Sequence, residues 1–257
     1  MDDYDRREFV KMSVPAFLGV TFALPSITAF AKDANANRGH KRSDEVLNWD
    51  AFLEKTTAEA KKQLDPKVWS EPAYVKRAAA LAKRLNLKDP AVLDFFAGYE
   101  NANPEFPEFE KMHREKLFEI SLVQFDEGEV IAHHDHPEMT GVLLCGKGKL
   151  SVENFDLLEE EAEGDGSDCG DEAAAEVKED DRVLLKRSGK ATLKRGDVST
   201  LTSKKSNIHR VSAKKFCQVI DLFTPPYDQK RIRESRWFEV DDGVFEGREG
   251  VYEAKVK

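Results

Sequence analysis

Cysteine is scarce in this 257-residue chain, which contains only Cys145, Cys169 and Cys217. None of them belongs to a Cys-x-x-Cys pair, which argues against a zinc ribbon or a thioredoxin-type redox centre. A chain of this length can also bury a sizeable core, so it does not need the disulfide framework of a small secreted domain. We therefore expect two core thiols and one loop thiol.

An excess of positive charge is also absent. The net charge is -9, charged residues make up 35% of the chain, and the mean hydropathy is -0.58, which together favour a soluble protein without a nucleic-acid footprint or a basic membrane surface. Much of the acidity is local, because residues 159–182 hold 12 Asp and Glu against Lys178 and Arg182. We expect an acidic, solvated loop insertion at residues 157–182, between two strands.

Uninterrupted apolar runs are scarce as well. A mostly apolar run from Met12 to Ala31 is broken by Pro15 and Pro25, and it follows the paired arginines Arg6 and Arg7. These features resemble a twin-arginine export signal, so we predict that residues 1–31 are such a signal, that residues 32–48 are a polar linker, and that the protein is exported to the periplasm. The alternative is an uncleaved membrane anchor, since the run is nearly long enough to span a bilayer.

The rest of the chain divides by the period of its apolar residues. Residues 49–107 follow a helical period punctuated by Pro66, Pro72 and Pro90, which predicts an N-terminal helical layer. From Leu117 the period changes to two, and short strands recur between glycine-rich turns. We predict an α+β, mainly β chain, in which residues 108–257 close as a barrel or jelly roll.

One stretch carries a candidate metal site. Gly128 is followed after five residues by His134 and His136, and alternate residues of a strand point to the same face. In a closed barrel, His209 from a distant strand can meet them, and three imidazoles suit Fe, Cu, Ni or Zn. His133 should point to the opposite face.

The other two histidines, His40 and His113, should lie outside the barrel strands and face solvent. We therefore expect neither to bind metal.

Together these motifs resemble the family of plant cysteine oxidases and cysteamine (2-aminoethanethiol) dioxygenase, which are cupins. The resemblance covers about Leu117 to Val240 and rests on three elements, which are His134-Asp135-His136-Pro137, Asn207-Ile208-His209 and Asp221-Leu222-Phe223-Thr224-Pro225-Pro226-Tyr227-Asp228. It implies a double-stranded β-helix with Fe²⁺ held by His134, His136 and His209.

Most cupins add a glutamate ligand four or five residues after the second histidine. Thr140 and Gly141 occupy those positions here, and Glu138 is an alternative carboxylate. A site of neutral ligands leaves the metal its full positive charge, which favours an anionic thiolate.

The resemblance also implies an activity. A non-haem iron thiol dioxygenase adds O₂ to the sulfur of a small aminothiol, or of an N-terminal cysteine on a peptide, to give a sulfinic acid. Asp221 and Tyr227 would be catalytic, with Asp221 holding the substrate amine or a water beside the iron and Tyr227 donating a hydrogen bond to bound oxygen or substrate. We expect a monomer.

Two other functions stay open at this stage. The first is a metal-dependent cupin of another reaction class, such as a carbon-directed oxygenase or an isomerase. The second is a non-catalytic, ligand-binding cupin. The chain also departs from family members that cross-link a cysteine and a tyrosine near the C-terminal strand, because it has Arg233-Glu234-Ser235-Arg236-Trp237-Phe238 there. Such a cross-link cannot form at these residues.

Overall fold

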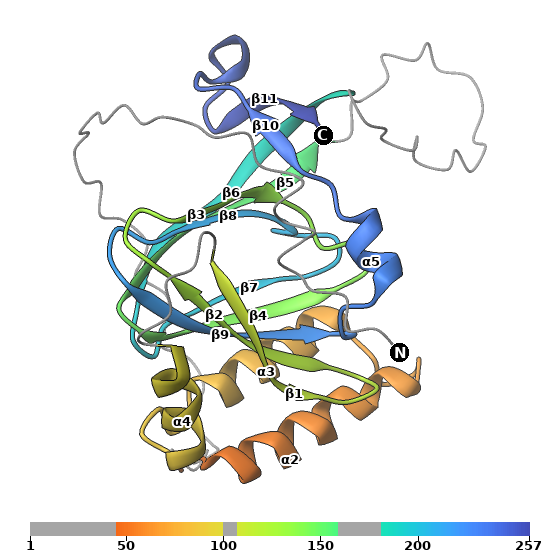
Figure 1. The fold of residues 1–257 in the computed structure, drawn as a ribbon. Coiled ribbons are helices and arrows are strands. Elements are labelled where there is room, and N and C mark those ends of the chain that lie inside the picture. The colour runs from red at the N-terminus through yellow and green to blue at the C-terminus, as the bar shows by residue number, and fades with distance from the viewer. Residues whose placement is uncertain (1–44, 100–106, 159–180) are drawn as a thin grey trace, which may run out of the picture.

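Two antiparallel sheets face each other in the computed structural model, which describes residues 45–99, 107–158 and 181–257 (Figure 1). One sheet has five strands in the order β1-β2-β9-β4-β7, and the other has six in the order β10-β11-β6-β5-β8-β3. The strands are β1 Glu108–Arg114, β2 Glu119–Phe125, β3 Val130–His134, β4 Thr140–Lys147, β5 Lys149–Leu158, β6 Arg182–Lys194, β7 Val198–Leu201, β8 Ile208–Ser212, β9 Cys217–Thr224, β10 Phe238–Val240 and β11 Val251–Val256.

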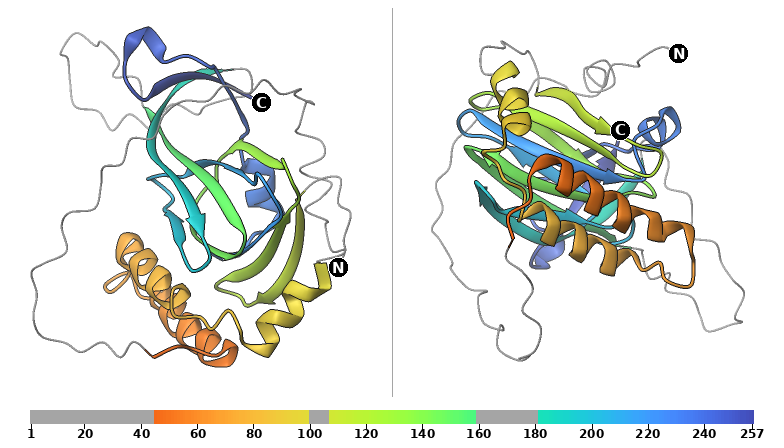
Figure 2. Two further views of the ribbon diagram at one scale, coloured as in Figure 1. Left: turned by 90° about the vertical axis from the view of Figure 1, so that its left-hand side faces the viewer. Right: turned by 90° about the horizontal axis from the view of Figure 1, so that it is seen from below.

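The helices are α2 Trp49–Ala60, η1 Lys61–Leu64, α3 Glu71–Ala82, α4 Pro90–Tyr99, α5 Gln229–Glu234 and η2 Phe245–Gly247. Helices α2, α3 and α4 cover the outer face of the five-stranded sheet, while α5 lies to one side of the two sheets (Figures 1 and 2). The predicted α+β, mainly β fold with an N-terminal helical layer is confirmed: it is a cupin-type double-stranded β-helix. Among the described helices, none combines the length and the apolar character needed to cross a membrane.

Strand β9 contributes side chains to two separate hydrophobic cores. All eight of its residues are buried, because the strand packs against helices on one face and lines the barrel on the other. Ile220 and Leu222 join the core beneath the helices, whereas Cys217 and Val219 join the core inside the barrel. Alternation along the strand therefore places Asp221 on the barrel side.

The structure differs from the sequence expectations at the linker and at the acidic loop. Leu47, expected in a polar linker, is 2% exposed and pairs with Leu85 of the helical layer. Strand β5 continues through Leu158 and β6 begins at Arg182, so strand structure enters both ends of the range expected for the acidic loop. Residues 1–44 and 159–180 lie outside the described part, so the export signal, His40 and Cys169 remain predictions.

Strand β1 was not expected at all, because four of its seven residues are charged. It is an edge strand, where exposed charges are common and discourage pairing with other chains. The expectation for His113 is wrong as a result. This histidine lies in β1, is half-buried, and packs its ring on Phe118 at 5.6 Å between centroids.

Candidate metal centre

Strands β3 and β8 bring two histidines opposite each other. The antiparallel register pairs His134 with His209, although 75 residues separate them in sequence. Their Nε2 atoms lie 3.2 Å apart, and the Nε2 of His136 lies 3.0 Å from that of His209. The three imidazoles that were predicted to meet are thus clustered, with their candidate ligand atoms all within 4.8 Å of one another.

His136 reaches this cluster from a loop, since β3 ends at His134. The side chain of Asn207 fixes the loop, because its Oδ1 accepts from the His136 backbone N–H at 2.9 Å and its Nδ2 donates to the His136 carbonyl at 2.9 Å. The simple strand alternation expected for the two histidines is therefore replaced by a side-chain brace. Gly128, which begins the motif, turns into β3 with a φ of 86°, a conformation that favours glycine.

The outer ring nitrogens determine which atoms face the cluster. His134 Nδ1 lies 2.7 Å from the Ala132 carbonyl, an acceptor, so Nδ1 carries the proton. His136 Nδ1 contacts the Tyr227 hydroxyl. In this arrangement, His134 directs the lone pair of its Nε2 toward His209.

The pKa values of two of these histidines indicate neutral rings. Burial lowers the pKa of His134 to about 4 and lowers the pKa of His209 well below its ordinary value. Neutral rings at this spacing either share a proton between Nε2 atoms or direct their Nε2 lone pairs at a cation bound between them. The donor set therefore fits a transition metal that prefers imidazole nitrogen.

A cavity of about 60 Å³ opens beside the three rings. Asp221 is the only carboxylate that lines it in the described structure, at the inward position of β9 that the sequence alternation indicated. Most of the other lining side chains are apolar: Phe109, Val123, Phe125, Ile131, Leu143, Val211, Val219, Ile232 and Trp237. A carboxylate in such a cavity can interact with a polar or positively charged group of a ligand.

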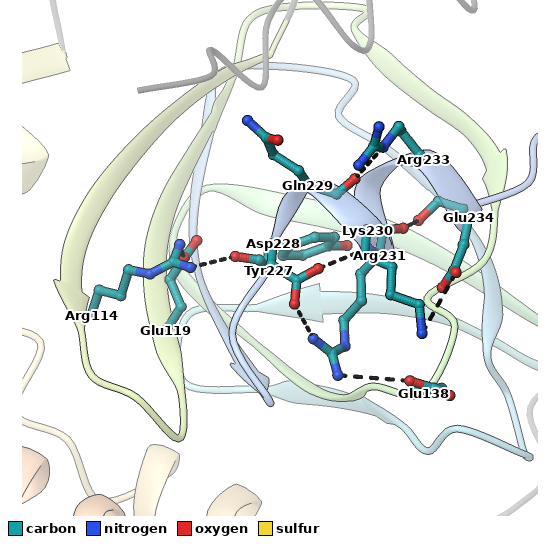
Figure 3. Close-up of polar contacts among 11 residues, drawn as sticks. Arg114, Glu119, Glu138, Tyr227, Asp228, Gln229, Lys230, Arg231, Arg233 and Glu234 are labelled. Carbon is teal, nitrogen blue, oxygen red and sulfur yellow. Dashed lines mark hydrogen bonds and ion pairs between the residues drawn. The ribbon is translucent and has the colours of Figure 1, made fainter. Parts of the chain in front are cut away.

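Tyr227 also lines the cavity, and arginines hold its chain segment from two sides (Figure 3). Arg114 donates from Nη2 to the Tyr227 carbonyl at 2.6 Å and pairs through Nη1 with Glu119 at 2.5 Å. On the other side, Asp228 caps α5 and pairs with Arg231. The tyrosine hydroxyl is thereby directed at His136. The family resemblance had implied a hydrogen bond to substrate or oxygen instead.

Two other polar candidates from the sequence lie apart from the cluster. His133 points away and packs edge-on against Phe155, with ring centroids 5.1 Å apart. Glu138 has 65% of its side chain exposed and lies 3.7 Å from Arg231. In the part of the chain that the structure describes, no carboxylate joins the three histidines in a ligand group.

The structure also adds residues that the sequence did not single out. The Trp237 ring stacks on His134 at 4.8 Å with 25° between the planes. Asp135, between two histidines of the cluster, accepts from the Arg236 guanidinium at 2.7 Å. No local pattern could have found these contacts, because they depend on where the C-terminal segment returns to the barrel.

The fold and this three-histidine cluster define a cupin with a candidate metal centre. The PCO_ADO family profile matches residues 87–248, well over half of the chain. The chain therefore belongs to the plant cysteine oxidase and cysteamine dioxygenase family, as its motifs predicted.

A relative that matches a smaller part of the chain agrees with this assignment. A probable 2-aminoethanethiol dioxygenase from Dictyostelium discoideum is 27% identical over 124 residues, which are 47% of this chain and 50% of that protein. The chain thus matches only half the length of this relative. The name of that relative describes a dioxygenase.

Solved structures similar to this chain include other cupins. A cupin superfamily protein from Desulfitobacterium hafniense is 16% identical, with a TM-score of 0.33 over 50% of this chain and 85% of that one. KdgF from Halomonas sp. is 18% identical, with a TM-score of 0.34 over 51% of this chain and 88% of that one.

Proposed function

We propose that this protein is an iron-dependent thiol dioxygenase that converts a small aminothiol, or an N-terminal cysteine, to its sulfinic acid. His134, His136 and His209 would hold the Fe²⁺. The observation that carries the proposal is the convergence of three Nε2 atoms beside a cavity that contains one carboxylate, in a member of this family.

The protein's own groups prepare the ligands. His134 is oriented by the Ala132 carbonyl, and His136 by Tyr227 and by the Asn207 brace. Such partners fix the ring orientation and make the ligand nitrogens more basic. When bound, Fe²⁺ supplies the redox chemistry by which O₂ can be added to a thiolate, which Zn²⁺ on the same ligands lacks.

The cavity suits a substrate with a positive end. Asp221 can pair with the ammonium group of an aminothiol or with the free amine of an N-terminal cysteine. The apolar walls keep water from the sulfur and strengthen that ion pair. The thiol and the amine would then be held in one orientation relative to the three histidines.

The test combines metal analysis with oxygen consumption. His209→Ala should lose bound iron and the thiol-dependent uptake of O₂, whereas His113→Ala should keep both, because His113 lies outside the cluster. The substrates would be cysteamine, cysteine and Cys-initiated peptides. The product mass should rise by two oxygen atoms on sulfur.

Each alternative function has a distinct result. Oxygen uptake that survives in His209→Ala contradicts the proposed site. Oxygen added to carbon would indicate a cupin of another reaction class. Bound metal without thiol-dependent O₂ uptake by the wild-type protein would indicate a non-catalytic cupin.

A further inference from the structure

One short segment covers the cavity. Residues 227–237, here called the roof, run from Tyr227 through α5 to Trp237, and Ile232 and Ser235 also line the cavity. Figure 1 shows α5 to one side of the two sheets, and its residue Ile232 reaches the cavity. The position of the roof therefore determines the size of the cavity and how much water enters it.

One buried carboxylate attaches the C-terminal end of the roof to the loop that carries His136. Asp135 is 2% exposed and lies between His134 and His136 in sequence. Its Oδ1 accepts from the Arg236 backbone N–H at 2.6 Å, and its Oδ2 accepts from Arg236 Nε at 2.7 Å. The Asp135 backbone N–H donates to the Arg236 carbonyl at 3.1 Å, so three hydrogen bonds join two residues.

This attachment fixes the neighbouring residue. Trp237 follows Arg236 directly, forms a backbone bridge with His134, and stacks its ring on the His134 imidazole. Because both the backbone and the side chain of Arg236 are held, the indole of Trp237 has little freedom to leave the cavity wall. Charge-assisted hydrogen bonds of this kind are roughly twice as strong as neutral ones.

We propose that Asp135 and Arg236 are a positioning pair that holds Trp237 against His134 and keeps the roof closed over the cavity. Neither residue lines the cavity, so both act through Trp237. The consequence for substrate binding rests on the proposed function, whereas the consequence for the position of Trp237 does not.

The chain offers a matched control on the same loop. Glu138 lies three residues beyond Asp135 and also faces a roof arginine, Arg231, but at 3.7 Å and with 65% of its side chain exposed (Figure 3). Exposed ion pairs of this kind contribute little. Arg231 also keeps its contact with Asp228, so the roof should stay in place when Glu138 is neutralised.

The first measurement needs no activity. The acrylamide quenching of Trp237, obtained by subtracting the fluorescence of Trp237→Phe from that of each protein, should increase about twofold in Asp135→Asn and Arg236→Gln, because local opening exposes the ring. Arg236→Lys, which keeps the charge but loses the forked geometry, should fall between these variants and the wild type. Glu138→Gln should match the wild type.

The second measurement uses the iron-loaded enzyme. Arg236→Gln should raise the KM for thiol about tenfold and change kcat less, because a loosened wall misplaces the substrate. Iron content should stay close to one ion per chain, as in the wild type, since the three ligands are unchanged.

Wild-type quenching and wild-type KM in Arg236→Gln and Arg236→Lys would overturn the proposal. So would an equal effect of Glu138→Gln. If Asp135→Asn does not fold, the Arg236 variants decide, since the Arg236 side chain is 31% exposed and Arg236→Lys keeps a positive charge beside the buried Asp135 carboxylate. A wild-type protein without thiol oxidation, but with the predicted quenching, would contradict the proposed function alone.

Discussion

The Tyr227→Phe variant tests the role of a single atom at the candidate metal centre, the hydroxyl oxygen of Tyr227. The ring of Tyr227 packs against Phe223, with centroids 4.8 Å apart, and against His136 at 5.8 Å, and phenylalanine retains both contacts. The substitution removes only the oxygen that pairs with His136 Nδ1. We expect the variant to fold normally and to bind metal more weakly than the wild type.

The burial of His136 and its contact with Tyr227 determine the size of this loss of affinity. His136 is 2% exposed, so its Nδ1 would lose its hydrogen-bond partner without gaining water, and a buried polar atom left in this state costs about 1–3 kcal/mol. The loss of such an outer partner typically weakens metal binding about 10- to 100-fold, or about 1.4–2.7 kcal/mol. The two ranges overlap, so Tyr227→Phe should raise the Kd for Fe²⁺ or Co²⁺ about 10- to 100-fold.

The assay is an anaerobic competition titration against a chromophoric chelator. Tyr252→Phe is the control, because Tyr252 lies on β11, packs on Phe155 at 5.9 Å and does not line the cavity. The Co²⁺ absorption bands should shift in Tyr227→Phe and stay unchanged in the control. Wild-type affinity together with wild-type bands in Tyr227→Phe would refute the role assigned to the hydroxyl.

Three further predictions concern stability. Saturating Fe²⁺ or Zn²⁺ at about 100 times its Kd should raise the free energy of unfolding by about 2.7 kcal/mol, and EDTA should reverse this in a thermal melt. Tyr74→Phe should cost about 1–2 kcal/mol in urea denaturation, because Tyr74 and Thr224 join the helical layer to the barrel through a buried 2.5 Å hydrogen bond. His133 has a folded pKa of about 4, lowered chiefly by burial, against an ordinary 6.5. The unfolded chain therefore takes up a proton first as the pH falls from 6.5 to 4, so the metal-free protein should lose about 3 kcal/mol over that window relative to His133→Phe.

Residues whose roles follow from local periodicity were predictable from the sequence. The inward position of Asp221 follows from its alternation with Val219 and Cys217, and both Cys145 and Cys217 are buried thiols as expected. Helices with an apolar stripe and strands of period two specify the layers of the fold before any long-range contact is known.

Other features depend on contacts between distant segments. Strand β1 has too many charges to resemble a strand, and it is held by pairing with β2. The contact of Trp237 with His134 comes from a bridge between residues 103 positions apart, which no sequence window contains. The hydroxyl of Tyr227 could be assigned to the cavity from its motif, but its choice of His136 over a substrate follows only from the path of the roof.

The register that pairs His134 with His209 also affects how the chain folds. Four strands, β4 to β7, lie between these two residues in sequence, and β3 cannot meet β8 until that intervening chain has been brought back on itself. Loop closure over such a distance is slow and comes with a high contact order. A metal ion would therefore bind late in folding, because only the completed barrel brings the three imidazoles together.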